Sequence, residues 1–228
     1  MEYLIQGFVK AVELLLERDG QTYSAIYATL QVSSYSMLAS LGLGIPLGFF
    51  LGYFNFPVKR QIRLLVDTCL ALPTVFIGLL VYSFLSRQGP LGDLGLLFTL
   101  PGIAIGQTIL ALPIVIALTA TAVESVDCHL RTTLISLGAS RLNLLLSTLW
   151  EVRFGILTAV LTAYGRVMTE VGISMMVGGN IKWHTRTITT AIALETNKGL
   201  FSIGIALGLV LIAIAFGVNL SLSFLRER

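Results

Sequence analysis

Arg166 and Glu170 place two opposite charges inside the otherwise apolar stretch of residues 154–179. Their spacing of four residues puts both side chains on one face of a helix. If this stretch crosses a membrane, such charges are costly and face the protein interior or water. Two interpretations follow. Either the pair holds a pathway or a dimer in register, which we favour, or Arg166 helps an anion to cross.

The end of the same stretch carries Gly178, Gly179 and Asn180. Two adjacent glycines permit an irregular backbone near a gate, or they simply end a helix. We therefore treat these three residues as candidates for a translocation pathway. Uncharged hydroxyl groups that could line an entrance follow in the sequence at Thr185, Thr187, Thr189 and Thr190.

Several kinds of chemistry find no support in the sequence. It contains no Gly-Lys-Ser/Thr phosphate loop, so we expect no ATP site in this chain. Cys69 and Cys128 are expected to be free thiols. The two histidines, His129 and His184, lie far apart in the sequence, and no residues show the spacing of metal ligands. No catalytic set and no basic arm for nucleic acid can be identified, and we expect no catalytic residue, metal or cofactor here.

The composition indicates an all-α membrane protein. Of the 228 residues, 55% are hydrophobic and only 12% are charged, whereas soluble domains carry about a quarter charged residues. The mean hydropathy is +0.87. A soluble protein this apolar would lack the polar surface to cover its exterior.

Five stretches are long enough to cross a membrane, since one helix needs about 20 apolar residues. They cover residues 29–53, 62–86, 94–123, 154–179 and 199–225. Pro46, Pro73 and Pro113 lie inside these stretches and are expected to bend them. Asp67 is expected to pair with Arg63. Small residues at intervals of four let helices approach closely, and they occur at Gly44, Gly48, Gly52, Gly102, Gly106, Gly204 and Gly208.

The basic residues of the short links predict the orientation in the membrane. With five spans, one side collects Lys59, Arg60, Arg63, Arg131, Arg141, Arg153, Arg226 and Arg228. Positive charge favours the cytoplasm. We therefore expect a multi-pass protein of the inner membrane with its N-terminus outside and its C-terminus in the cytoplasm.

The first residues predict a separate amphipathic helix. Its apolar side carries Leu4, Ile5, Phe8, Val9, Val12, Leu15 and Leu16, and its polar side carries Glu2, Gln6, Lys10, Glu13 and Glu17. We expect it to lie in the outer interface, with a tail packed on its own bundle as the alternative. The predicted organisation is an interfacial helix over residues 1–22 and a transmembrane domain over residues 23–228.

The link over residues 124–153 is too polar at its start to face lipid and too regular for a disordered loop. Leu130, Leu134 and Leu137 fall along one helical face. Gly138 then stands where a helix-ending glycine belongs, and Ser140 can cap a following helix. We predict a helix, a glycine turn and a second helix on the cytoplasmic face.

This link resembles the conserved cytoplasmic loop of binding-protein-dependent ABC importer permeases, in which Glu-Ala-Ala precedes a glycine by three residues. Here Gly138 keeps its place, but Thr132, Thr133 and Leu134 hold the Glu-Ala-Ala positions, so the acidic residue is missing. By this resemblance the first short helix is a coupling helix that docks on an ATPase subunit. The residues implied in that contact are Arg131, Thr132, Thr133, Leu134, Leu137, Gly138, Ala139, Ser140 and Arg141.

The resemblance implies a type I importer fold and a set of partners. They are a second copy of this chain, two ATPase subunits that bind ATP and magnesium, and a soluble or lipid-anchored binding protein outside. Residues 165–199 resemble oxyanion permeases, most closely those for tungstate and next those for molybdate. Another anion such as sulfate or phosphate is the alternative substrate. The rival class is an ATP-independent transporter or channel, which co-purification with an ATPase subunit would exclude.

Overall fold

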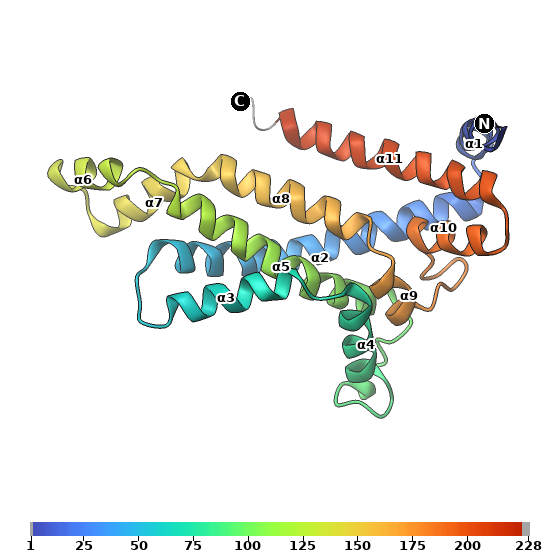
Figure 1. The fold of residues 1–228 in the computed structure, drawn as a ribbon, viewed down its shortest axis with the longest axis horizontal. Helices are drawn as coiled ribbons and strands as arrows, with labels where there is room; N and C mark the ends of the chain where they lie inside the picture. Colours follow the sequence, from blue (N-terminus) through green and yellow to red (C-terminus); the bar gives the residue numbers. More distant parts are fainter. Residues whose placement is uncertain (1, 225–228) are drawn as a thin grey trace.

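The computed structural model describes the backbone of residues 2–224 and the side chains of residues 5–127, 129–130 and 132–221, and within that part the secondary structure is entirely helical (Figure 1). The helices are α1 (Glu2–Leu16), α2 (Gly20–Tyr53), α3 (Lys59–Leu70), α4 (Thr74–Leu85), the short 3-10 helix η1 (Gly92–Leu94), α5 (Leu100–Glu124), α6 (Cys128–Ser136), α7 (Arg141–Glu151), α8 (Arg153–Met168), α9 (Gly172–Gly178), α10 (Ile188–Asn197) and α11 (Phe201–Phe224).

Three of the five predicted spans are single helices. Helices α2, α5 and α11 are each long and apolar enough to cross a membrane. Helices α2 and α5 continue through Pro46 and Pro113. The total reaches five spans if each of two bent helix pairs, α3 with α4 and α7 with α8, counts as one.

The second predicted span, residues 62–86, is bent at Pro73 as expected, and the bend divides it into two helices. Helices α3 and α4 meet at an angle of 98°. Pro73 lies at the break and precedes the first residue of α4. A proline removes one hydrogen bond of the helix, and it disfavours helical geometry in the residue before it. Figure 1 shows the consequence, since α4 leaves the side of the bundle.

The fourth predicted span, residues 154–179, is wrong as a single helix. Helix α8 ends at Met168 and α9 begins at Gly172. At about 1.5 Å per residue, the 16 residues of α8 extend only about 24 Å. The helix is preceded by α7, which is inclined to it by 51°.

Helices α2 and α5 pack along each other through the glycines that the sequence spaces four residues apart. A Cβ atom on Gly48 would lie 2.7 Å from the carbonyl oxygen of Ile116, and one on Gly52 would lie 2.7 Å from that of Ala120. A Cβ on Gly44 would lie 2.8 Å from Cγ1 of the Val115 side chain. Gly208 differs, since nothing lies within 4 Å of its Cβ position, so it is not a packing residue within the described chain.

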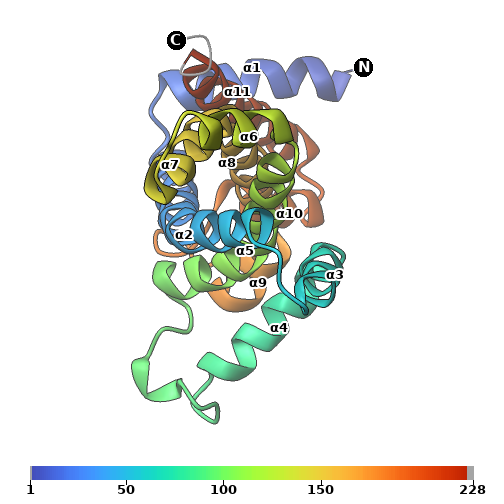
Figure 2. The ribbon, with the colours of Figure 1, turned by 90° about the vertical axis from the view of Figure 1, so that its left-hand side faces the viewer.

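Helix α1 lies across the end of the bundle that is opposite α6 and α7 (Figures 1 and 2). Gly7 sits against Ile205 of α11, and Ala11 is buried. The same helix leaves Phe8, Val9 and Leu16 between 60% and 78% exposed. Helix α1 therefore packs on its own bundle and still keeps an exposed apolar side. The predicted positions Glu2 and Leu4 have side chains outside the described part.

Candidate functional site

Helices α6 and α7 project from one end of the bundle, where α5 ends and α8 begins (Figure 1). Viewed along the bundle, they lie over the ends of the long helices (Figure 2). Asp127 caps α6, because its Oδ1 accepts the amide of His129 at 2.8 Å. The Ser140 hydroxyl caps α7 by accepting the amide of Asn143 at 3.3 Å.

Gly138 closes the turn between the two helices in the left-handed conformation, with φ +79°. Its amide donates to the carbonyl of Ile135 at 2.9 Å, and the amide of Ala139 donates to that of Leu134 at 3.0 Å. These two bonds form a Schellman motif, which satisfies the last carbonyls of a helix. Helix, glycine turn and capped second helix thus follow the sequence prediction.

The residues implied in ATPase contact fall into two groups. Leu134 and Ala139 are half-buried, whereas Thr132, Thr133, Leu137, Gly138, Ser140 and Arg141 are exposed. Leu137 was expected on the same face as Leu134 but is 78% exposed, because it follows the last residue of α6. With Ile135, which is 54% exposed, it forms an apolar tip. The side chain of Arg131 lies outside the described part.

A cavity of about 640 Å³ lies behind α6. It is lined by Ala122, Ser125, Val126, Asp127, His129, Leu130, Thr133, Glu151, Val152 and Gly155. Gly155 of α8 packs closely against Ala122 of α5, because a Cβ on Gly155 would overlap the Ala122 side chain. The close contact holds the two helices that carry α6 and α7 against each other.

Arg153, which contributed to the predicted orientation only as a positive charge, lies at the bend between α7 and α8. Its guanidinium donates to the carbonyl of Trp150 at 2.7 Å. It also lies over the rings of Trp150 and Phe154, 4.7 and 4.3 Å from their centroids. The aromatic residues on either side of an arginine were the available sequence signal.

A group of charges joins α3 to the end of α5. The predicted pair is present, with Nε of Arg63 3.5 Å from Oδ1 of Asp67. Glu124 adds contacts to Lys59 at 3.0 Å and to Arg63 at 3.6 Å. The Arg63 guanidinium also donates to the hydroxyl of Thr121 at 2.6 Å. These contacts hold α3 against the end of α5, the helix that directly precedes α6.

Arg166 and Glu170 meet where α8 ends, and their environments differ. Nη1 of Arg166 lies 3.4 Å from Oε2 of Glu170. The Glu170 side chain is 2% exposed and its Oε1 accepts the amide of Ile173 at 3.2 Å, whereas the Arg166 side chain is 45% exposed. Glu170 therefore also caps the start of α9.

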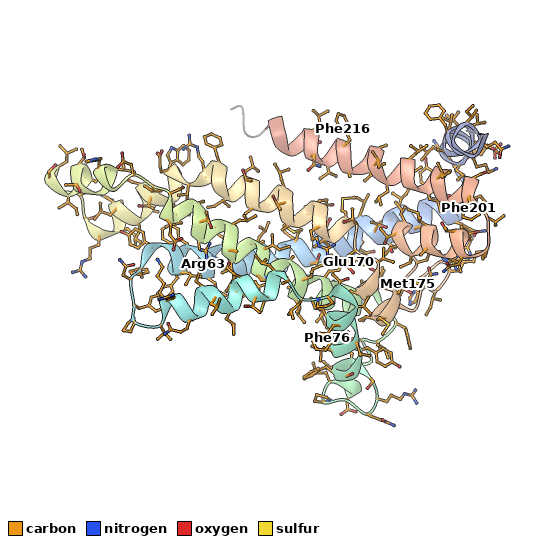
Figure 3. The ribbon with its side chains drawn as sticks, in the orientation of Figure 1. Arg63, Phe76, Glu170, Met175, Phe201 and Phe216 are labelled. Carbon is orange, nitrogen blue, oxygen red and sulfur yellow. The ribbon has the colours of Figure 1, made fainter. Side chains whose placement is uncertain are left out.

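A buried polar network crosses the bundle at this break, at the level labelled Glu170 in Figure 3. The Glu170 carbonyl accepts the hydroxyls of Thr189 at 3.0 Å and Ser174 at 3.3 Å. Gln107 donates to Ser174 and accepts from Ser36, each at 3.4 Å. The network links α2, α5, α9 and α10, and it satisfies the backbone that the break would otherwise leave unpaired.

Gly178, Gly179 and Asn180 form a helix terminus followed by a tight loop. Gly179 ends α9 in the left-handed conformation, with φ +67°, and Asn180 follows with φ +49°. The Asn180 side chain accepts Nε of Arg186 at 3.1 Å. Glu170 precedes α9, whereas Gly178, Gly179 and Asn180 end and follow it, so the ion pair and these three residues lie at opposite ends of this helix.

The four threonines do not line an entrance in the described chain. Each is at most 5% exposed. Thr187 and Thr190 form the capping box of α10, and Thr185 binds the carbonyl of Gly178. Each of the four hydroxyls forms a hydrogen bond with a backbone amide or carbonyl group.

Comparison with known proteins gives one family and a consistent set of relatives. Residues 44–228 match the family described as "Binding-protein-dependent transport system inner membrane component". The "Tungstate uptake system permease protein" of Campylobacter jejuni is 51% identical, over 96% of this chain and 92% of its own length. The protein of the same description from Peptoclostridium acidaminophilum is 38% identical over the whole of both chains. The "Molybdenum transport system permease protein" of Escherichia coli K12 is 28% identical, over 74% of this chain and 77% of its own.

Solved structures agree on the fold. A chain of the inward-facing MetNI methionine ABC transporter superposes with a TM-score of 0.73 at 14% identity, covering 90% of this chain and 94% of its own. A chain of a bacterial alginate ABC transporter, bound to its pentasaccharide-loaded periplasmic protein, superposes with a TM-score of 0.72 at 20% identity. It covers 92% of this chain and 79% of its own.

Proposed function

Because this chain belongs to the family of binding-protein-dependent transport system inner membrane components, we propose that it is the membrane-spanning subunit of an ATP-driven importer of tungstate. The observation that supports tungstate as the substrate is the high sequence identity to a tungstate uptake permease along nearly the whole chain. Molybdenum and sulfate permeases are more distant relatives, which supports the wider class of tetrahedral oxyanions.

The protein works as part of a complex in this proposal. ATP and magnesium bind to two ATPase subunits, and α6 is the element on which each of them docks. The exposed apolar tip of Ile135 and Leu137 suits a contact that excludes water. A second copy of the chain completes the pathway, and a binding protein delivers the anion from outside.

Reconstitution tests the proposal directly. The chain, its ATPase subunit and its binding protein are placed in proteoliposomes, and tungstate uptake is measured with molybdate and sulfate as competitors. We expect uptake that requires ATP and the binding protein and that favours tungstate. Uptake without ATP would instead support a secondary transporter or channel. Faster uptake of sulfate would replace tungstate as the substrate.

Single cysteines test the proposed orientation, in which α6 and α7 face the cytoplasm. Asp93→Cys and Asn143→Cys both sit at exposed positions and are introduced after Cys69 and Cys128 are replaced by alanine. In intact cells we expect an impermeant thiol reagent to label position 93 and not position 143. Position 143 should react after the membrane is opened. The opposite pattern in intact cells would invert the proposed topology.

A further inference from the structure

Helix α8 exposes a polar face along most of its length. The polar face consists of Thr158, Thr162 and Arg166 of α8 and of Thr169, which directly follows the helix, and all four are exposed. At 3.6 residues per turn they fall within about 80° of one another around the helix. The adjacent side of the helix, about 100° around its axis, carries Ala159, Ala163 and Val167, which are buried. By contrast, α11 exposes Ile212, Phe216 and Leu220.

Contact between this polar face and lipid would be energetically unfavourable. A charged side chain at membrane depth normally faces a partner or a water-filled cavity. Within the described part of the chain, the Arg166 guanidinium makes a single contact, the ion pair with Glu170. A guanidinium has five N–H donors, so most of them have no protein partner within the described chain.

The hydroxyl groups of this polar face can donate hydrogen bonds to an anion. Thr158 donates to the carbonyl of Phe154 at 2.9 Å and Thr162 to that of Thr158 at 2.8 Å. Each of these carbonyls lies inside α8, where an amide of the helix already serves it. The hydroxyl can therefore turn outward and donate to an anion without leaving the backbone unpaired.

We propose that this face of α8 lines the translocation pathway and that Arg166 is its contact for a tetrahedral oxyanion dianion. The planar guanidinium matches two oxygens of such an ion at once. The proposal rests on the function proposed above and adds the residues that touch the substrate.

Glu170 makes this contact weak enough for transport. Its carboxylate is buried, held by the amide of Ile173, and fixed beside Arg166. The pair is close to neutral as seen from the pathway, so the dianion meets hydrogen-bond donors without a strong net attraction. An isolated arginine would hold a dianion tightly and slow its release.

Thiol accessibility tests whether the face is wet. In the full complex, freed of Cys69 and Cys128, Thr162→Cys is compared with Phe216→Cys on α11. Because a thiol must ionise to react, we expect a negatively charged methanethiosulfonate to modify position 162 at least about ten-fold faster, in the resting or the ATP-bound state. Equal rates in both states would overturn the proposal.

Transport tests the role of Arg166. Arg166→Lys keeps the charge and the partner of Glu170 but loses the planar fork, so we expect normal dimer yield and tungstate uptake reduced about ten-fold, the equivalent of about 1.4 kcal/mol. Ser83→Ala is the matched control, because this exposed hydroxyl of α4 also donates to its own helix, at 2.9 Å, and we expect its uptake to be unchanged. Wild-type uptake by Arg166→Lys would contradict the assigned contact. Absence of tungstate uptake by the unaltered complex would refute the proposed function instead.

Discussion

Gly138→Val is expected to abolish coupling while leaving the protein in the membrane. Gly138 has φ +79°, which a β-branched residue strongly resists. The strain of about 1–2 kcal/mol per left-handed residue is relieved if the turn opens and α6 changes its angle to α7. In the reconstituted complex, ATP hydrolysis stimulated by the loaded binding protein should fall to the unstimulated level.

Gly138→Asn is the matched control. No atom lies within 4 Å of a Cβ at this position, so side-chain size alone cannot disturb the turn. Asparagine adopts the left-handed conformation more readily than other residues with a side chain. We expect this variant to keep most of the stimulated hydrolysis. Stimulation of Gly138→Val at the wild-type level would remove the α6–α7 segment from the coupling role.

Local chemistry explains why the α6–α7 segment could be predicted from the sequence. A glycine at the end of a leucine-patterned helix and a serine two residues later determine the turn and the cap by themselves. The same holds for the glycines of α2, because a spacing of four residues requires no knowledge of the partner helix to indicate close packing. Pro73 likewise indicated a bend, although its size of 98° depends on how α4 packs.

The break after Met168 could not be predicted, because the apolar pattern continues across it. The break depends on tertiary contacts, in which Thr189 donates to the carbonyl of Glu170 and Glu170 caps the amide of Ile173. The pairing of Arg166 with Glu170 was apparent from their spacing. Their different burial was not, because a helical projection places both on one face and contains no information about what covers each.

Glu170→Leu should have the largest effect on assembly. It removes the acceptor of the Ile173 amide and leaves the Arg166 guanidinium without its partner. The buried Ile173 amide then has no acceptor, and an unsatisfied buried donor typically costs about 1–3 kcal/mol, a sizeable part of the roughly 5–15 kcal/mol that keeps a typical protein folded. We expect little monodisperse dimer in detergent and a marked fall in the thermal midpoint of what remains.

Two further variants separate the structural role of Glu170 from the contact made by Arg166. Glu170→Gln still offers an oxygen to the Ile173 amide, so it should assemble better than Glu170→Leu. The double variant Arg166→Leu with Glu170→Leu leaves no unpaired charge and should recover part of the dimer yield, yet its tungstate uptake should stay low because the pathway has lost its cation. Recovery of uptake together with assembly would show that the pair only holds the fold. A normal thermal midpoint for Glu170→Leu would show that the break between α8 and α9 does not depend on this carboxylate.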